Sequence, residues 1–187
     1  PRAWESAPRE GVRLRMGDTL RVETGPHVVL WPAGAEPVAP PYTVRATLRK
    51  EEGRLYEGYG VVLGGARLDA PADEQRYSYF LVRGDGSFLI KRRAGAETPV
   101  VRPWTFHPAI RRDTEEGGEP NELEVEVGEA EAVFRVNGAE VARLPASGVD
   151  AQGIPGLRAA HEVRVAVTRY EVVPGATGDP GRREVVP

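Results

Sequence analysis

Residues 121–145 read NELEVEVGEAEAVFRVNGAEVARLP, and this stretch decides the fold class. Its beginning alternates leucine or valine with glutamate, the period-two pattern of a strand that buries one face and exposes the other. A second apolar alternation leads into Asn137-Gly138, a pair that favours a type I′ turn because both central residues need a positive φ. Val141 and Leu144 resume the apolar pattern beyond this turn. The stretch therefore predicts three antiparallel strands joined by two tight turns.

Similar short patterns recur on both sides of this stretch, without helical periodicity. The other predicted strands cover residues 19–24, 28–31, 42–49, 58–65, 77–83, 87–93, 99–104, 154–160 and 162–173. Many short strands separated by turn signals are typical of an all-β fold in which two antiparallel sheets pack face to face. In the strand at 58–65 the glycines at 58, 60 and 64 share one face, which predicts a shallow floor with few side chains.

The chain of 187 residues fits one sandwich domain with short terminal segments. We predict an N-terminal arm over residues 1–17, in which Trp4 could pack against the body and the residues from Val12 onward form an edge strand. The sandwich is predicted over 18–173 and a flexible tail over 174–187. The polar start, PRAWESAPRE, fits a chain that begins after a removed export signal or inside a larger protein.

Composition argues against several classes of function. A net charge of −3 differs from the basic surface typical of nucleic-acid binding, so we predict no nucleic-acid partner. No apolar run approaches the roughly 20 residues of a transmembrane helix, so no membrane span is predicted. Without cysteine, the chain has no disulfide, no thiolate nucleophile and no cysteine-bound zinc.

The order of the segments carries a resemblance to a known superfamily. The segments are GYGVVLGG (58–65), YSYFLVRGDGSFLIKRR (77–93), Trp104, the stretch 121–145, and QGIPGLRAAHEVRVAVTRYEVV (152–173). This order resembles the concanavalin A-like lectin/glucanase superfamily, in its LamG-like jelly-roll branch with 3-keto-disaccharide hydrolase-type relatives. The resemblance spans residues 42–173. It implies a jelly-roll sandwich whose concave face can hold sugars, and an exported protein, extracellular or periplasmic.

Aromatic side chains are the first candidates for sugar binding, because apolar sugar faces stack on rings. Tyr77 and Tyr79 lie on the face opposite Phe80, so they look onto the concave surface if Phe80 is in the core. We expect basic residues of neighbouring strands to join them there. The predicted ligand-binding residues are Tyr77, Tyr79, Arg45, Arg49, Lys91, Arg158 and His161. Such a mixed face would suit an acidic glycan, or it would be a plain solvated face.

A catalytic alternative rests on Glu122, Glu124 and Glu126. They resemble the E-x-D-x-E strand of family-16 glucanases, where a pair of carboxylates about 5 Å apart retains configuration. The middle residue here is Glu instead of Asp, and the strand fits the structural pattern N-x-L-x-V before the Asn-Gly turn better. The competing interpretation is a solvated acidic face.

Metal binding receives little support from spacing. His27, His107 and His161 form no H-x-H or H-E-x-x-H motif. The carboxylates of Asp69, Asp73 and Asp85 could bind Ca²⁺ but match no known loop motif, so calcium stays an alternative and we predict no metal site.

The leading hypothesis is a non-catalytic, carbohydrate-binding jelly-roll module of an exported protein. The alternatives are a glycoside hydrolase or related sugar-cleaving enzyme, and a structural or protein-interaction module without a sugar ligand. The partner expected from the first hypothesis is a glycan of unknown identity, and the oligomeric state stays open.

Overall fold

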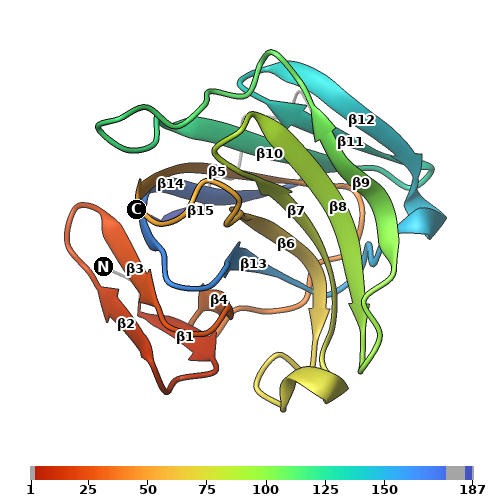
Figure 1. Cartoon of the computed structure of the whole chain (residues 1–187). Coiled ribbons are helices and arrows are strands. Elements are labelled where there is room, and N and C mark those ends of the chain that lie inside the picture. The colour runs from red at the N-terminus through yellow and green to blue at the C-terminus, as the bar shows by residue number, and fades with distance from the viewer. Residues whose placement is uncertain (1–2, 176–183, 187) are drawn as a thin grey trace.

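The computed structural model describes residues 3–175 and 184–186, which form two antiparallel sheets stacked as a sandwich (Figure 1). Sheet A has the strand order β1 (Trp4–Ala7), β4 (Val28–Pro32), β13 (Ile154–Ala159), β6 (Tyr59–Ala66), β7 (Arg76–Val82), β8 (Ser87–Ala94) and β9 (Val100–Phe106). Sheet B has the order β12 (Ala139–Pro145), β11 (Glu131–Val136), β10 (Asn121–Val127), β5 (Tyr42–Glu52), β14 (Arg164–Pro174), β3 (Leu20–Thr24) and β2 (Val12–Arg15). A further strand, β15 (Glu184–Val186), pairs with β14. The predicted all-β sandwich is confirmed.

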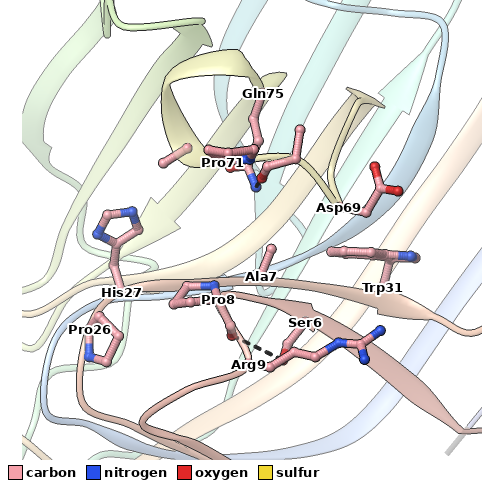
Figure 2. Close-up of a pocket in the computed structure, with 12 residues that line it drawn as sticks. Ser6, Ala7, Pro8, Arg9, Pro26, His27, Trp31, Asp69, Pro71 and Gln75 are labelled. Atoms are coloured by element: carbon pink, nitrogen blue, oxygen red, sulfur yellow. Dashed lines mark hydrogen bonds between the residues drawn. The ribbon is translucent and has the colours of Figure 1, made fainter.

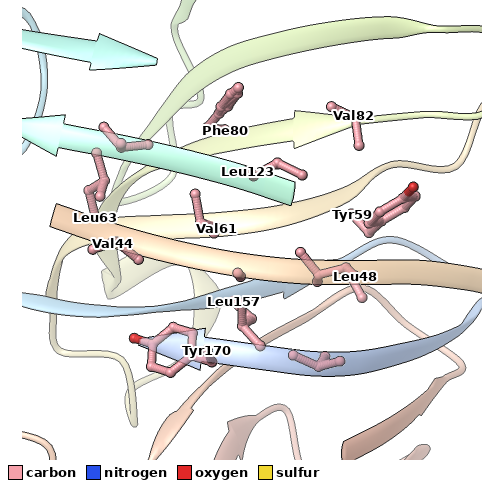
Figure 3. Packing of buried hydrophobic residues seen from close by; sticks show 14 of the residues in the cluster. Val44, Leu48, Tyr59, Val61, Leu63, Phe80, Val82, Leu123, Leu157 and Tyr170 are labelled. Atoms are coloured by element: carbon pink, nitrogen blue, oxygen red, sulfur yellow. The ribbon is translucent and has the colours of Figure 1, made fainter. Parts of the chain in front are cut away.

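The two sheets enclose the main core, to which the stretch 121–145 contributes directly. Leu123, Val125 and Val127 are fully buried, while the glutamates between them face away from the core. Figure 3 shows Leu123 near Phe80 and Val82 of sheet A. The ring of Phe80 lies 5.2 Å from that of Phe134 on β11, so aromatic contacts join the sheets. The alternation therefore predicted the buried face of β10 correctly.

The Asn-Gly turn between β11 and β12 has the expected backbone. Asn137 has φ 50° and Gly138 has φ 84°, so both residues are left-handed as the turn requires. The side chain of Asn137 is also bonded into the fold: its Nδ2 donates to Ala109 O at 2.8 Å, and its Oδ1 accepts from the backbone N–H of Glu122 at 2.9 Å. The turn thus ties β10 to the loop after β9.

The N-terminal residues belong to both sheets. β1 pairs with β4 in sheet A, and β2 pairs with β3 in sheet B. Trp4 is buried in the core with its ring 5.0 Å from that of Tyr170, as the sequence suggested. Within the segment predicted as an arm, β2 is the edge strand expected from Val12 onward, and β1 adds a second edge strand, in sheet A. Most of the flexible tail predicted over 174–187 lies outside the described residues.

A second apolar cluster covers the outer face of sheet A, the face turned away from sheet B. Its buried members are Val29, Trp31, Val62, Leu68, Tyr77, Tyr79, Leu81 and Leu89. The segment after β6, which includes the short 3-10 turn η1 (Ala72–Glu74), folds back over this face and contributes Leu68. Gln75 holds the segment, because its Nε2 donates to Leu68 O at 2.7 Å and to Ala70 O at 3.0 Å. In the described part of the chain, no helix is long and apolar enough to cross a membrane.

Candidate functional site

A pocket of about 670 Å³ opens beside the outer cluster of sheet A (Figure 2). One wall comes from β1 and the residues after it, and the other from the segment that carries η1. Figure 2 places His27 at one end, Trp31 and Asp69 at the other, and Pro71 and Gln75 across from Pro8. The lining residues are Ser6, Ala7, Pro8, Arg9, Pro26, His27, Trp31, Asp69, Ala70, Pro71, Ala72 and Gln75.

Local hydrogen bonds fix the walls of this pocket. The indole Nε1 of Trp31 donates to Glu5 Oε2 at 3.1 Å across the β1–β4 pair, which fixes the ring at the Asp69 end. The hydroxyl of Ser6 donates to Pro8 O at 3.2 Å. The result is a concave site that combines apolar surface with a few polar groups, the usual make-up of a small-molecule site.

Arg158 on β13 lies next to this pocket. It is opposite Val29 of β4, and Val29 is opposite Ala7 of β1, which lines the pocket. Because neighbouring strands are about 4.8 Å apart, Arg158 and Ala7 are separated by roughly 10 Å across the sheet. On its other side Arg158 is opposite Gly60 of β6. A Cβ at Gly60 would come 2.0 Å from Phe80 O, so the fold requires glycine at this position.

Two tyrosines hold the guanidinium of Arg158. Its Cζ lies 4.5 Å from the centroid of the Tyr79 ring, within cation–π range. Its Nε donates to the hydroxyl of Tyr77 at 3.3 Å. Arg93, which is opposite Tyr77 on β8, donates from Nη1 to Ala72 O at 3.1 Å and to Gly95 O at 3.2 Å. Two half-buried guanidinium groups therefore lie on the outer face of sheet A.

Two histidines complete this basic cluster. The rings of His27 and His161 meet edge to face with centroids 5.3 Å apart. Burial, with Arg158, His161 and Arg93 nearby, lowers the pKa of His27 to about 4. His27 is therefore neutral at pH 7 and can donate or accept a hydrogen bond at the end of the pocket. We use the name basic cluster for Arg158, Arg93, His27 and His161.

The structure changes the role expected for the two tyrosines. Tyr77 and Tyr79 lie on the predicted face, opposite Phe80, but they are 0% and 4% exposed. Leu68 and its segment cover that face, so neither ring is open for a sugar to stack on. Burial raises the pKa of Tyr79, although the nearby charge of Arg158 acts to lower it. The two tyrosines position Arg158 and do not form an exposed platform.

Arg45 and Arg49 are on the wrong sheet for the predicted site. Both lie on β5 in sheet B, whereas Tyr77, Tyr79 and Lys91 lie on β7 and β8 in sheet A. Arg49 is exposed and donates to Gly118 O at 2.7 Å. The structure brings Tyr77, Tyr79, Lys91 and Arg158 to one outer face with His161 nearby, and it excludes the two arginines of β5 from it.

A row of alternating charges crosses the outer face of sheet B. Its members, one per strand from β14 to β12, are Glu171, Arg45, Glu124, Arg135 and Glu140. Glu124 Oε1 lies 2.9 Å from Arg135 Nη1, and its other oxygen accepts from Arg45 Nε at 2.7 Å. Burial alone would lower the pKa of Arg45, but the bonded Glu124 and its acidic neighbours raise it overall.

The candidate catalytic glutamates belong to this charged face. Glu122, Glu124 and Glu126 share one side of β10, as their alternation predicted. Glu122 lies 3.4 Å from Arg169, and Glu126 lies 2.9 Å from Arg135. Each carboxylate is thus paired with an arginine of the same sheet, Glu122 with one that lies two strands away, and this pattern explains the three glutamates by sheet stabilisation.

The aspartates weighed for calcium lie in two different places. Asp69 and Asp73 belong to the segment over sheet A, whereas Asp85 is in the β7–β8 turn, where it accepts from Arg83 Nε at 3.1 Å. Within residues 3–175 and 184–186, no group of three or more His, Asp or Glu side chains is placed to hold a metal ion.

A second aromatic surface lies at the β7–β8 turn. The guanidinium of Arg83 is 4.9 Å from the Tyr56 ring and 4.2 Å from the Trp104 ring. Tyr56 is 65% exposed, unlike Tyr77 and Tyr79. Because it carries an open ring and lies apart from the pocket lining, this surface serves as the comparison surface for experiments on the pocket.

Sequence reasoning missed the pocket walls and two members of the basic cluster. His27 was considered only as a metal ligand, and Arg93 was not singled out. Arg93 follows Lys91 by two positions, so the strand alternation already placed it on the same face. Nothing in the sequence indicated that residues 6–9 would lie opposite the segment around Pro71, because that arrangement depends on how two loops far apart in the chain meet.

No family model and no curated protein matches this sequence. Solved structures do match. The carbohydrate binding module CBM66 from Bacillus subtilis superposes with a TM-score of 0.68 at 9% identity, covering 91% of this chain and 94% of that one. A Bacillus subtilis protein of unknown function with a galectin-like fold has a TM-score of 0.64 at 13% identity, covering 91% and 88%.

The carbohydrate recognition domain of Emp46p, in a potassium-bound form, is a third match. It has a TM-score of 0.61 at 12% identity, covering 92% of this chain and 89% of that one. At these identities the likeness concerns the fold alone. The chain has the concanavalin A-like jelly-roll sandwich fold that these carbohydrate-binding and galectin-like structures share.

Proposed function

We propose that this protein is a non-catalytic carbohydrate-binding module and that it holds its glycan in the pocket on the outer side of sheet A. The observation that carries the proposal is the pocket of about 670 Å³ beside the basic cluster. Its volume suits a short oligosaccharide, and its lining combines apolar surface with polar groups at both ends.

The polar groups suit the chemistry of a sugar. Asp69 accepts hydrogen bonds from hydroxyl groups, and neutral His27 can donate or accept one. Proline and alanine side chains between them offer apolar surface to the C–H faces of a ring. The fold shared with carbohydrate-binding modules supports the same proposal. An exported location, extracellular or periplasmic, and membership of the LamG-like branch are parts of this proposal.

A glycan array on the purified protein tests the proposal. We expect at least one class of oligosaccharide to bind, and titration calorimetry then measures its affinity. Ala72→Trp places a large ring at an exposed position of the pocket wall and should lower the affinity at least tenfold. Ser147→Trp adds the same ring in η2 (Ala146–Gly148), away from the pocket, and should leave the affinity unchanged.

Tyr56→Ala separates the pocket from the second aromatic surface. If this variant loses binding while Ala72→Trp keeps it, carbohydrate binding stands but the pocket is the wrong site. If the array shows no binding to neutral or acidic glycans, the proposed function is wrong.

A further inference from the structure

Arg158 and Arg93 differ from Arg45, Arg135 and Arg169 of sheet B in what surrounds them. Arg45, Arg135 and Arg169 each lie within ion-pair distance of at least one glutamate. Arg158 and Arg93 have no carboxylate partner within the described ranges, 3–175 and 184–186, although both are half-buried. A half-buried cation without an anion is costly, because it has lost water without gaining a counter-charge.

The bonds that Arg158 makes leave its binding edge open. Its Nε is used by Tyr77, and one flat side of the guanidinium faces Tyr79. Nη1 and Nη2 have no hydrogen-bond acceptor in the described chain. These two groups form the fork that binds carboxylate, sulfate and phosphate oxygens in parallel.

Arg93 adds a second positive charge. Its Nη1 is occupied by Ala72 O and Gly95 O, but its Nε is buried and has no partner in the described structure. Its charge and that of Arg158 both act on His27, which lines the pocket. An anion bound beside Arg158 would therefore meet a second positive charge.

The charges along the pocket are also polarised. The basic cluster adjoins the end at His27, and Asp69 lies at the opposite end (Figure 2). An acidic sugar fits this gradient when its anionic group points to Arg158 and its hydroxyl groups point to Asp69. A neutral sugar would leave the positive end uncompensated, and a doubly acidic end group would be repelled by Asp69.

We propose that the glycan is acidic and that the guanidinium fork of Arg158 binds its anionic group, a carboxylate of a uronic acid or a sulfate ester. This inference rests on the proposed function, since it names the ligand class of the same pocket. It assigns Arg158 as the residue that determines specificity, held in position by Tyr77 and Tyr79.

Calorimetry with three oligosaccharides of equal length tests the inference: one neutral, one built of uronic acids and one sulfated. We expect at least one acidic oligosaccharide to bind at least tenfold more tightly than the neutral one, with an affinity that falls as salt rises. The acidic oligosaccharide that binds more tightly identifies the anionic group as carboxylate or sulfate.

Two variants test the role of the fork. Arg158→Gln should abolish the preference for the acidic oligosaccharide, and Arg158→Lys should keep only part of it, because lysine keeps the charge without the planar fork. Arg143→Gln removes an exposed arginine of β12 and serves as the matched control, expected to bind like the unmodified protein. Thermal unfolding of each variant shows that it is folded.

The outcomes separate the two proposals. If neutral and acidic oligosaccharides bind equally and Arg158→Gln changes nothing, the inference is overturned while carbohydrate binding stands. If Arg143→Gln weakens binding as much as Arg158→Gln does, general charge is responsible and the inference is again wrong. If none of the three binds and the array is also blank, the proposed function fails and the inference fails with it.

Discussion

The side-chain amide of Asn137 donates a 2.9 Å hydrogen bond to Oδ1 of Asn121, across the pair of strands that the Asn-Gly turn follows. Asn121 is buried and uses its Nδ2 to bond the hydroxyl of Tyr59 at 3.1 Å in the opposite sheet. The two amides therefore link the turn, the start of β10 and sheet A in one chain of hydrogen bonds, which makes them a structural requirement of the fold.

Substitutions of Asn137 should separate its two contributions. Asn137→Gly keeps the left-handed backbone and loses the side-chain bonds, so we expect the free energy of unfolding to fall by about 1–2 kcal/mol. Asn137→Ala should lose roughly 1 kcal/mol more, because an alanine at φ 50° is strained. Urea unfolding of both variants measures the difference. Equal losses would show that the backbone conformation contributes nothing here.

The buried ion pair of Lys50 gives a second prediction. Its side chain is 1% exposed, and its ammonium lies 2.8 Å from Asp113 Oδ2 and also donates to Arg54 O at 2.6 Å. Lys50→Met should lower the free energy of unfolding by about 3–5 kcal/mol, because it leaves Asp113 without its partner. In the double variant Lys50→Met/Asp113→Asn, the loss should be smaller than the sum of the two single losses. Denaturant unfolding of all four proteins gives the coupling, and strict additivity would contradict a direct pair.

Alternation in the sequence reveals the face of a strand but not the sheet to which it belongs. Arg45 and Tyr79 both point away from the core, yet they lie on opposite outer surfaces of the sandwich. β5 and β6 are consecutive in the chain and enter different sheets, so neighbours in sequence are not neighbours in the sheet. A charge pattern held the missing information: Glu124 is opposite Arg45 and Arg135, which pairs the three strands of sheet B.

The burial of Tyr77 and Tyr79 could have been predicted from a different feature of the sequence. Every residue of β7 after Arg76 is buried, and the run YSYFLV is almost continuously apolar or aromatic. A continuous run of this type indicates a strand covered on both faces, whereas clean alternation indicates one solvated face. What covers the second face could not be predicted, because the segment that contributes Leu68 is a polar loop in sequence.

The charged row on sheet B predicts a stability effect without a binding effect. Glu124→Gln removes the carboxylate between Arg45 and Arg135, so we expect a loss of up to about 1 kcal/mol in the free energy of unfolding. Glycan affinity should not change, because the pocket lies on the outer side of sheet A and Glu124 is in sheet B. Calorimetry and urea unfolding on the same variant check both statements. Release of reducing sugar by the unmodified protein, lost in Glu124→Gln, would instead support the hydrolase alternative.

His27 predicts how stability depends on pH. Its pKa is about 4 in the fold and 6.5 in its ordinary state, so between these values the unfolded chain binds a proton that the folded chain does not. The free energy of unfolding should therefore decrease as pH falls from about 6.5 to 4. His27→Gln should show a shallower decrease in thermal unfolding across this window. Ser147→Trp, which leaves every titratable side chain in place, is the control, and a slope equal to that of the unmodified protein is expected for it.

The same histidine predicts how ligand affinity depends on pH. Burial, with the charges of Arg158, His161 and Arg93, lowers the pKa of His27 to about 4, and a bound anion would offset the repulsion from these charges. The pKa of His27 should then rise in the complex, so affinity for an anion should increase as pH falls below the bound pKa and level off below about 4. A sulfated oligosaccharide is the suitable probe, because its charge does not change in this range. Calorimetry between pH 7 and pH 4 should show tighter binding at low pH for the unmodified protein and a smaller change for His27→Gln. A pH dependence that is identical in the two proteins would place the anion away from His27, even if Arg158 binds it.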